Sequence, residues 1–273
     1  MSELTKRILF AVPAALVFLI LTWLGNYWFV GLVIIISLFV QREMSIIIES
    51  AGFKPEEFFP YTIGLWILLT PFVEHDLIIG FGILLFFVAV QIFKTSDRGL
   101  KELINTFFCG IYGPLGLLPL ILIRNMGTPE IGFVLTISLL FMVWGNDVFA
   151  YFGGKALGKN KMAPTISPNK TWEGFSFGIL GALVGLGLVI YFVPFQLPVP
   201  ILVLAPAAVF VSIFGPIGDL TASRMKRAAK VKDASAILPG HGGFFDRFDA
   251  LILAAPAFYV YLYFLQMMGY VTL

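Results

Sequence analysis

Residues 1–30 read MSELTKRILFAVPAALVFLILTWLGNYWFV, and they indicate the class of protein. A long apolar run follows Lys6 and Arg7, and a second apolar run begins almost immediately after it. A cleaved secretory signal has a single short apolar region, so this pattern favours a first membrane-spanning helix that stays in the protein. A helix needs about 20 apolar residues to cross a bilayer, and the first run is long enough to do so.

The same apolar character continues along all 273 residues, of which 59% are apolar and 12% are charged. A soluble domain usually carries about 25% charged residues, so this chain lacks the polar surface that a water-soluble body needs. The apolar runs are continuous rather than alternating, which favours helices. We therefore predict an all-α polytopic membrane protein of about nine transmembrane helices, at residues 8–25, 27–40, 60–73, 77–93, 104–123, 131–152, 175–195, 199–218 and 248–269.

The lysines and arginines test this number of spans, because cytoplasmic loops carry most of the basic residues of a membrane protein. With nine spans, 17 of the 18 Lys and Arg residues fall on the side of the N-terminus, and only Arg124 falls on the other side. We therefore expect a protein of the cytoplasmic (inner) membrane, with its N-terminus and polar loops in the cytoplasm and its C-terminus on the far side. Segment 41–59 mixes charged and apolar residues and is expected to lie in the headgroup plane.

Residues 1–273 contain no linker or low-complexity tract, so we expect a single transmembrane domain. The net charge of +2 gives no reason to expect a nucleic-acid partner. The one cysteine, Cys109, excludes an internal disulfide and a thiolate metal cluster. Chemistry is expected in two long polar loops of the C-terminal half, which covers about residues 141–250. These loops are residues 144–174 and residues 218–250.

Four aspartates of this half are candidate metal ligands: Asp147, Asp219, Asp246 and Asp249. An ionisable group at membrane depth costs about 3 kcal/mol or more unless it faces protein, water or an ion, which makes Asp147 a candidate by default. Asp246 and Asp249 share a face if a helix has already begun there. Mg²⁺ prefers such oxygen ligands, together with water and substrate phosphates. The alternatives are a solvated helix end for Asp147 and charge compensation at a helix N-terminus for Asp246 and Asp249.

Cations and glycines accompany these carboxylates in the second loop: Lys226, Arg227, Lys232, Arg247 and the PGHGG turn with His241, Gly242 and Gly243. Arginine suits bidentate contact with phosphate and lysine supplies a point charge, although both also bind anionic headgroups. The backbone of a glycine turn can bend close to an anion. Carboxylates, cations and a glycine turn together are typical of phosphoryl or nucleotidyl transfer. Their place at the mouth of lipid-exposed helices indicates a lipid phosphate as one substrate.

The second loop resembles the signature of CDP-diacylglycerol synthases, also called phosphatidate cytidylyltransferases. Residues 223–249 read SRMKRAAKVKDASAILPGHGGFFDRFD and match that signature without a departure. The first loop is similar to the family as well, with Asn146 and Asp147 followed by ISPNKTWEG at residues 166–174.

The resemblance implies the reaction CTP + phosphatidate → CDP-diacylglycerol + pyrophosphate, dependent on Mg²⁺ and with a second cation left open. CTP, phosphatidate and membrane lipids are the expected partners, and the choice between a monomer and a homodimer stays open. With this reaction in view, we expect Asp219 and Asp246 to hold the metal, supported by Asp249 or Asp147. The predicted catalytic residues are Asp219, Asp246, Lys232 and Arg247. Substrate contacts are expected from Asn146, Ser167, Lys170, Thr171, Ser223, Lys226, Arg227, His241, Gly242 and Gly243.

Two other functions stay open on the sequence. A CTP-dependent polyprenol or dolichol kinase would share the nucleotide and the polytopic scaffold but would release CDP rather than pyrophosphate. A membrane transporter would explain the intramembrane Asp147. Transporters commonly place their sites at mid-bilayer between repeats, whereas this chain gathers its polar groups on one side and has no repeat.

Overall fold

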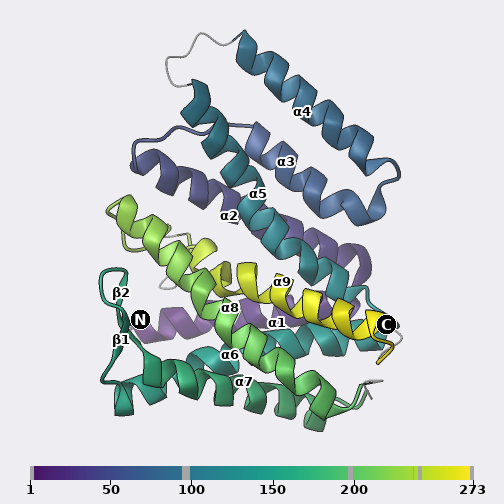
Figure 1. Cartoon of the computed structure of the whole chain (residues 1–273), viewed down its shortest axis with the longest axis vertical. Helices are drawn as coiled ribbons and strands as arrows, with labels where there is room; N and C mark the ends of the chain where they lie inside the picture. The colour runs from purple at the N-terminus through teal and green to yellow at the C-terminus, as the bar shows by residue number, and fades with distance from the viewer. Residues whose placement is uncertain (1–2, 94–98, 196–198, 236, 239–241, 271–273) are drawn as a thin grey trace.

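The computed structural model describes residues 3–93, 99–195, 199–235, 237–238 and 242–270. In these residues the chain forms α-helices joined by short connections, one 3₁₀ turn (η1) and one β-hairpin. The elements in order are α1 Glu3–Leu24, α2 Asn26–Ser50, α3 Phe59–Leu69, η1 Thr70–Phe72, α4 Asp76–Ile92, α5 Gly99–Arg124, α6 Pro129–Leu157, β1 Lys161–Ala163, β2 Ser167–Thr171, α7 Trp172–Phe192, α8 Ile201–Ala228 and α9 Phe245–Met267 (Figure 1).

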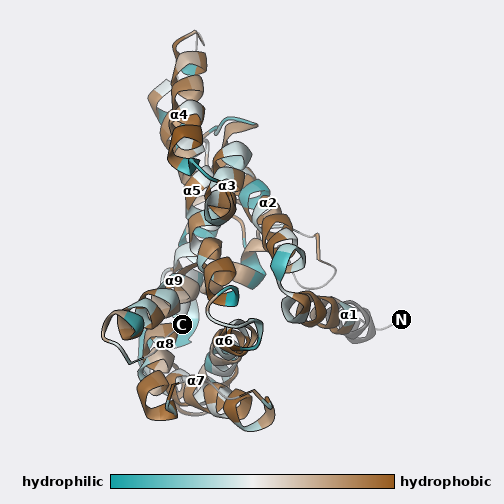
Figure 2. Cartoon of the chain, turned by 90° about the vertical axis from the view of Figure 1, so that its right-hand side faces the viewer, coloured by the Kyte–Doolittle hydropathy of each residue, from teal (hydrophilic) through white to brown (hydrophobic). Residues whose placement is uncertain are grey.

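Six of the described helices are long and apolar enough to cross a membrane, and α1, α3 and α4 supply shorter apolar segments. The prediction of an all-α polytopic membrane protein is therefore confirmed, and each predicted span overlaps one helix. Figure 2 shows apolar residues along much of the ribbon, including α1 and α7. Large side chains such as Trp28 and Tyr191 are exposed on the outside, as expected for a surface that faces lipid.

Two helices extend well beyond the predicted spans. Helix α2 continues to Ser50, so residues 41–50 form one helix with the second predicted span, and the place of segment 41–59 in the headgroup plane stays a prediction. The helical period explains the extension, because Val33, Val40 and Ile47 lie on the same buried face of α2. Helix α8 likewise continues to Ala228, which places Asp219 inside a helix rather than at its end.

The helices are layered along the long axis of the molecule, with α4 at one extreme and α7 at the other (Figure 1). Helix α6 packs on α7, α8 packs on α9, and α5 lies between α3 and α9. Glycine permits the closest of these approaches. A Cβ on Gly181 of α7 would lie 2.1 Å from the carbonyl oxygen of Gly145 in α6, so the two backbones are in direct contact.

The two loops that were predicted to hold chemistry meet at one end of the helices. The N-terminus, the β-hairpin and the start of α9 lie at this end, and the C-terminus lies at the other (Figure 1). The first loop forms the antiparallel hairpin β1–β2, in which Lys161 pairs with Thr171. The second loop is shorter than predicted, because it begins only after α8 ends at Ala228.

Candidate active site

Two polar cavities adjoin at this end of the helices. The smaller has a volume of about 260 Å³ and lies between α6, α8 and the start of α9. Its lining residues are Asp147, Asp219, Lys226, Asp233, Asp246, Arg247, Asp249 and Ala250. The larger has a volume of about 630 Å³ and lies between α6, the hairpin, α7 and α8. Asp147 and Asp219 line both cavities, so the two form one continuous polar site.

The four predicted metal ligands all line the smaller cavity, although they come from three helices. Helix α6 supplies Asp147, α8 supplies Asp219, and α9 supplies Asp246 and Asp249. Gly218 permits this convergence, because a Cβ at this position would lie 2.3 Å from the carbonyl oxygen of Asp249. A larger residue would push α8 away from α9 and would separate the carboxylates.

Asp219 and Asp246 each form an ion pair with a lysine. The ammonium group of Lys170, in β2, lies 2.5 Å from Oδ2 of Asp219, and the hydroxyl of Ser223 donates a hydrogen bond to Oδ1 of Asp219 at 3.3 Å. Lys226 pairs with Oδ1 of Asp246, and only 8% of this lysine is exposed. A buried ammonium group needs such a partner, because an unpaired buried charge is strongly unfavourable. Ion pairs therefore join the first loop to α8 and α8 to α9.

Asp246 also organises the backbone around it. Its Oδ2 atom accepts hydrogen bonds from the backbone N–H of Ala234 at 2.9 Å and of Gly243 at 3.0 Å. Gly242 adopts a φ of +79°, a conformation that glycine adopts without strain, and pairs with Leu238 in an isolated β-bridge. The glycine pair thus shapes the turn around Asp246. Direct contact of these glycines with a substrate stays a prediction.

The donor set of the smaller cavity fits a hard divalent cation. Asp147, Asp219 and Asp249 are close enough for their charges to repel one another, and the Asp147 carboxylate makes no hydrogen bond or ion pair within the described residues. In the same part of the chain, no three His, Cys, Asp or Glu side chains are gathered closely enough to hold one ion. Mg²⁺ usually takes only one or two carboxylates and completes its shell with water and substrate phosphates. Binding of Mg²⁺ by one or two of these carboxylates therefore stays a prediction.

The first loop is held in place by a helix cap and by Lys170. The hydroxyl of Thr171 accepts a hydrogen bond from the backbone N–H of Gly174 at 3.1 Å, which caps α7. Lys170 and Thr171 both line the larger cavity. Ser167, at the start of β2, lines neither cavity. The predicted contact of Ser167 with substrate therefore has no counterpart in these two cavities.

Asn146 and Arg247 are the predicted substrate-binding and catalytic residues that are best placed to receive a ligand. Asn146 is 3% exposed and lines the larger cavity, and its side-chain Nδ2 has no hydrogen-bond partner in the described part of the chain. A buried donor without a partner costs about 1–3 kcal/mol, so a ligand oxygen would be favourable there. Arg247 lines the smaller cavity, and its guanidinium has no ion pair with a described residue.

The remaining predicted residues have other positions. Arg227 donates hydrogen bonds to the backbone oxygens of Ile166 at 3.4 Å and Val231 at 3.1 Å, so it links the second loop to the hairpin. Lys232 is exposed and lines neither cavity. His241 lies outside the described residues.

Sequence reasoning missed three residues of interest. Lys155 and Lys161 line the larger cavity, and they were visible in the sequence as cations of the first loop. Glu43 of α2 is fully buried and accepts hydrogen bonds from the start of α9. Its only signal in the sequence was its position on the helical period of α2, beyond the predicted end of that span at residue 40.

Comparison with known proteins identifies the family of this chain. The chain matches the model of the cytidylyltransferase family over residues 5–265. It is 37% identical to a protein of Bacillus subtilis (strain 168) named phosphatidate cytidylyltransferase, over 95% of this chain and 97% of that protein. A protein of the same name from Brucella abortus biovar 1 (strain 9-941) is 34% identical over 96% of this chain and 94% of its own length. The chain therefore belongs to the cytidylyltransferase family.

Proposed function

We propose that this protein transfers the cytidylyl group of CTP to phosphatidate, which yields CDP-diacylglycerol and pyrophosphate. The observation that carries the proposal is a single cavity in which four aspartates from three helices meet Lys226 and Arg247. Membership of the cytidylyltransferase family and the relatives named phosphatidate cytidylyltransferase support the same reaction.

The proposed chemistry needs charge stabilisation more than proton transfer. A phosphate oxygen of phosphatidate attacks the α-phosphorus of CTP, the bond from that phosphorus to the bridging oxygen breaks, and pyrophosphate leaves with the electron pair. A phosphate monoester has its second pKa at about 6 and is largely ionised near neutral pH, so no strong general base is required. The protein must hold two polyanions together and stabilise the departing pyrophosphate. In the proposal, Lys170, Lys226 and Arg247 supply that positive charge.

We propose Mg²⁺ as the cofactor, held by Asp219 and Asp246 with support from Asp147 and Asp249. A divalent cation, when bound, neutralises phosphate charge and polarises the phosphorus–oxygen bond that breaks. The shared cavity supports this assignment, because all four carboxylates line it.

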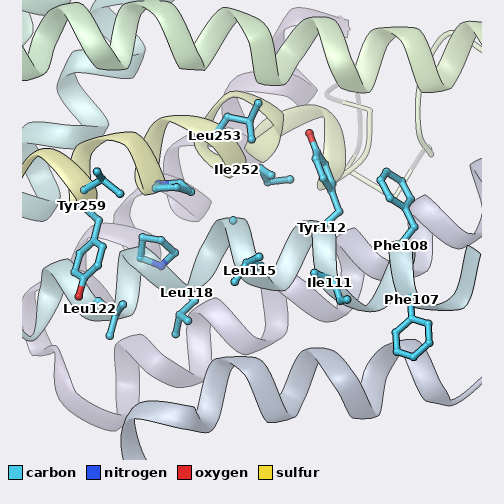
Figure 3. Close-up of a pocket in the computed structure, with 14 residues that line it drawn as sticks. Phe107, Phe108, Ile111, Tyr112, Leu115, Leu118, Leu122, Ile252, Leu253 and Tyr259 are labelled. Atoms are coloured by element: carbon cyan, nitrogen blue, oxygen red, sulfur yellow. The ribbon is translucent and has the colours of Figure 1, made fainter. Parts of the chain in front are cut away.

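The lipid substrate needs an apolar surface beside the polar cavity. A groove of about 740 Å³ lies between α5 and α9 and is lined almost entirely by apolar side chains, with Tyr112 toward one end and Tyr259 toward the other (Figure 3). Ile252 of this groove comes three residues after Asp249, so the groove begins next to the polar cavity. We propose that the acyl chains of phosphatidate lie in the groove while its phosphate lies among the aspartates.

The proposed location of the site is the cytoplasmic face of the inner membrane. If all nine predicted spans cross the membrane, the sequence assigns 17 of the 18 Lys and Arg residues to the same side as the N-terminus and the two polar loops. Basic residues favour the cytoplasmic side during insertion. This orientation gives the site access to CTP from the cytoplasm and to phosphatidate from the inner leaflet.

The test uses purified protein with Mg²⁺, phosphatidate and CTP that is labelled separately in the cytidine and in the γ-phosphate. The proposal expects cytidine-labelled CDP-diacylglycerol and γ-labelled pyrophosphate. Release of CDP together with a γ-labelled lipid would identify a lipid kinase instead. Transport across vesicles without turnover of CTP would identify a transporter. The Asp219→Asn variant serves as the background control.

A further inference from the structure

Glu43 of α2 is bound by residues that lie 192 to 202 positions further along the chain. Its Oε1 atom accepts hydrogen bonds from the hydroxyl of Ser235 at 2.6 Å and from the backbone N–H of Phe244 at 3.1 Å. Its Oε2 atom accepts a hydrogen bond from the backbone N–H of Phe245 at 2.7 Å. The Glu43 carboxylate therefore ties α2 to the α8–α9 connection and to the start of α9.

These contacts explain how an acidic side chain is accommodated at 0% exposure. Burying a carboxylate is unfavourable unless hydrogen bonds and positive charge replace its hydration. The N-terminus of α9 supplies both, because the first backbone N–H groups of a helix have no partner within it and carry the positive end of its dipole. Phe244, at the N-cap position of α9, makes no side-chain capping hydrogen bond. Glu43 thus caps α9 from another helix.

Glu43 and Asp246 both accept hydrogen bonds from the α8–α9 connection and the start of α9. Asp246 accepts hydrogen bonds from Ala234 and Gly243. In each case the next residue along the chain, Ser235 or Phe244, donates a hydrogen bond to Glu43 instead. The position of Asp246 in the cavity therefore depends on a backbone whose neighbouring donors are fixed by Glu43.

Gly243 makes the close approach of Glu43 possible. A Cβ on Gly243 would lie 2.3 Å from Oε2 of Glu43 and 2.6 Å from its Cδ. Gly243 was predicted as a substrate contact, but this geometry gives a separate reason for glycine at the position. Any side chain at residue 243 would displace the carboxylate or the start of α9.

We propose that Glu43 is a positioning residue for cytidylyl transfer, which fixes the start of α9 so that Asp246 and Arg247 face the cavity. Glu43 lines neither polar cavity, so it acts through the segment that it holds rather than on a substrate. This inference rests on the proposed function. Misplacing a reacting group by about 1 Å can lower a rate about 100-fold, which sets the expected size of the effect.

The first experiment compares Glu43→Gln with the unmodified protein. Glutamine keeps the size of the side chain but turns one acceptor oxygen into an NH₂ donor that faces other donors. We expect kcat to fall about 100-fold while the KM for CTP changes less than about threefold. Hydrogen exchange of the backbone amides in residues 243–248 is expected to become at least about tenfold faster, because their local opening becomes easier.

The matched control is Gln41→Leu, on the same helix. Gln41 is buried and donates a hydrogen bond to the backbone oxygen of Pro60 at 2.5 Å, away from α9. This variant is expected to lower Tm without changing kcat or the exchange of residues 243–248. If both variants lower Tm and both keep kcat within about twofold of the unmodified protein, Glu43 has only a structural role and the inference is wrong.

A second pair of variants tests the contact with Gly243. Gly243→Ala alone is expected to lower kcat, and addition of Glu43→Asp, which shortens the acidic side chain, is expected to recover part of the loss. If the fold loss of kcat in the double variant equals the product of the fold losses in the two single variants, residues 43 and 243 are not coupled. If the unmodified protein forms no CDP-diacylglycerol, the proposed function is wrong. The hydrogen-exchange measurement would still test whether Glu43 stabilises the start of α9.

Discussion

Two buried cations at opposite ends of the helices, Lys226 and Arg124, have different kinds of partner. Lys226 pairs with the carboxylate of Asp246 at the wall of a polar cavity. Arg124 instead donates hydrogen bonds to three backbone carbonyl oxygens, and its guanidinium also lies 6.0 Å from the ring centre of Phe133. The three carbonyl groups belong to Thr22 at 2.7 Å, Trp23 at 2.9 Å and Pro129 at 3.0 Å.

This difference in partners distinguishes Lys226, which we propose acts in the reaction, from Arg124, whose contacts are structural. Carbonyl groups at the ends of helices are fixed by the backbone, so the partners of Arg124 cannot be exchanged without unfolding the helix ends. A carboxylate beside a cavity can exchange its cationic partner for another cation, and the lysine can then meet a phosphate. Substitutions around Lys226 should therefore change the reaction, and substitutions around Arg124 should change stability.

The largest effect is expected for Asp246→Asn. Loss of this charge removes a predicted metal ligand, so we expect the rate of CDP-diacylglycerol formation to fall at least about 1,000-fold, measured at saturating CTP. The variant also leaves Lys226 buried without its partner, which costs about 3–5 kcal/mol. Near-normal activity would remove Asp246 from the metal site.

A double variant separates the two consequences of that change. Asp246→Asn combined with Lys226→Met removes the unpaired ammonium group and should recover part of the Tm that the single variant loses. Its activity should stay as low as that of Asp246→Asn. Recovery of activity together with Tm would mean that the single variant is inactive only because it is unstable.

A smaller loss is expected for Lys226→Met alone. Methionine keeps an apolar chain of similar length but removes the charge that is proposed to stabilise pyrophosphate, so kcat should fall about 100-fold. The control is Lys230→Gln, an exposed lysine at the end of α8 that lines neither polar cavity. Its activity should stay within about twofold of the unmodified protein. Equal losses in the two variants would indicate a general effect of positive charge at the membrane surface.

A still smaller effect is expected in the apolar groove. Leu115 is 53% exposed and lines the groove, so Leu115→Trp should crowd an acyl chain and raise the KM for phosphatidate about fivefold, or about 1 kcal/mol, with the KM for CTP unchanged. Leu188→Trp, on the exposed surface of α7 away from the groove, is the control. If both variants raise the KM for phosphatidate equally, the groove is not the binding site of the lipid.

The spans and the group of aspartates were predictable because each depends on local patterns. The lengths of the apolar runs predicted one helix for each span, and the close spacing of Asp246 and Asp249 predicted that they share a helix start. Helix ends were less predictable, since α2 and α8 continue past the first polar residues. A helix ends where its backbone hydrogen bonds end, and this point need not coincide with the edge of the lipid.

The partners of the charged residues were not predictable, because they come from distant parts of the chain. The sequence indicated phosphate binding for Lys226 and Arg227 alike, whereas the structure pairs Lys226 with Asp246 and directs Arg227 to backbone oxygens. Glu43 had no local signal for its role, because the donors that it accepts from follow it by 192 or more residues. A charge in a sequence does not specify which opposite charge or donor the fold brings to it.

The smallest effect on the reaction is expected for Arg124→Met, which tests the structural side of the comparison. The variant leaves three carbonyl groups without their charged donor, and a single hydrogen bond to a charged group contributes about 1.5–3 kcal/mol. Tm should therefore fall, while the kcat of the folded protein stays within about twofold.

Gly25→Ala should act in the same direction by a different route. Gly25 has a φ of +65°, and a Cβ there would lie 2.4 Å from Nη2 of Arg124, so alanine would displace the guanidinium from the carbonyl groups of Thr22 and Trp23. The measurements are thermal unfolding and the activity per folded molecule for both variants. Either variant could instead lower kcat as much as Lys226→Met does. In that case, the type of partner, carbonyl or carboxylate, would not tell us whether a buried cation is structural or takes part in the reaction.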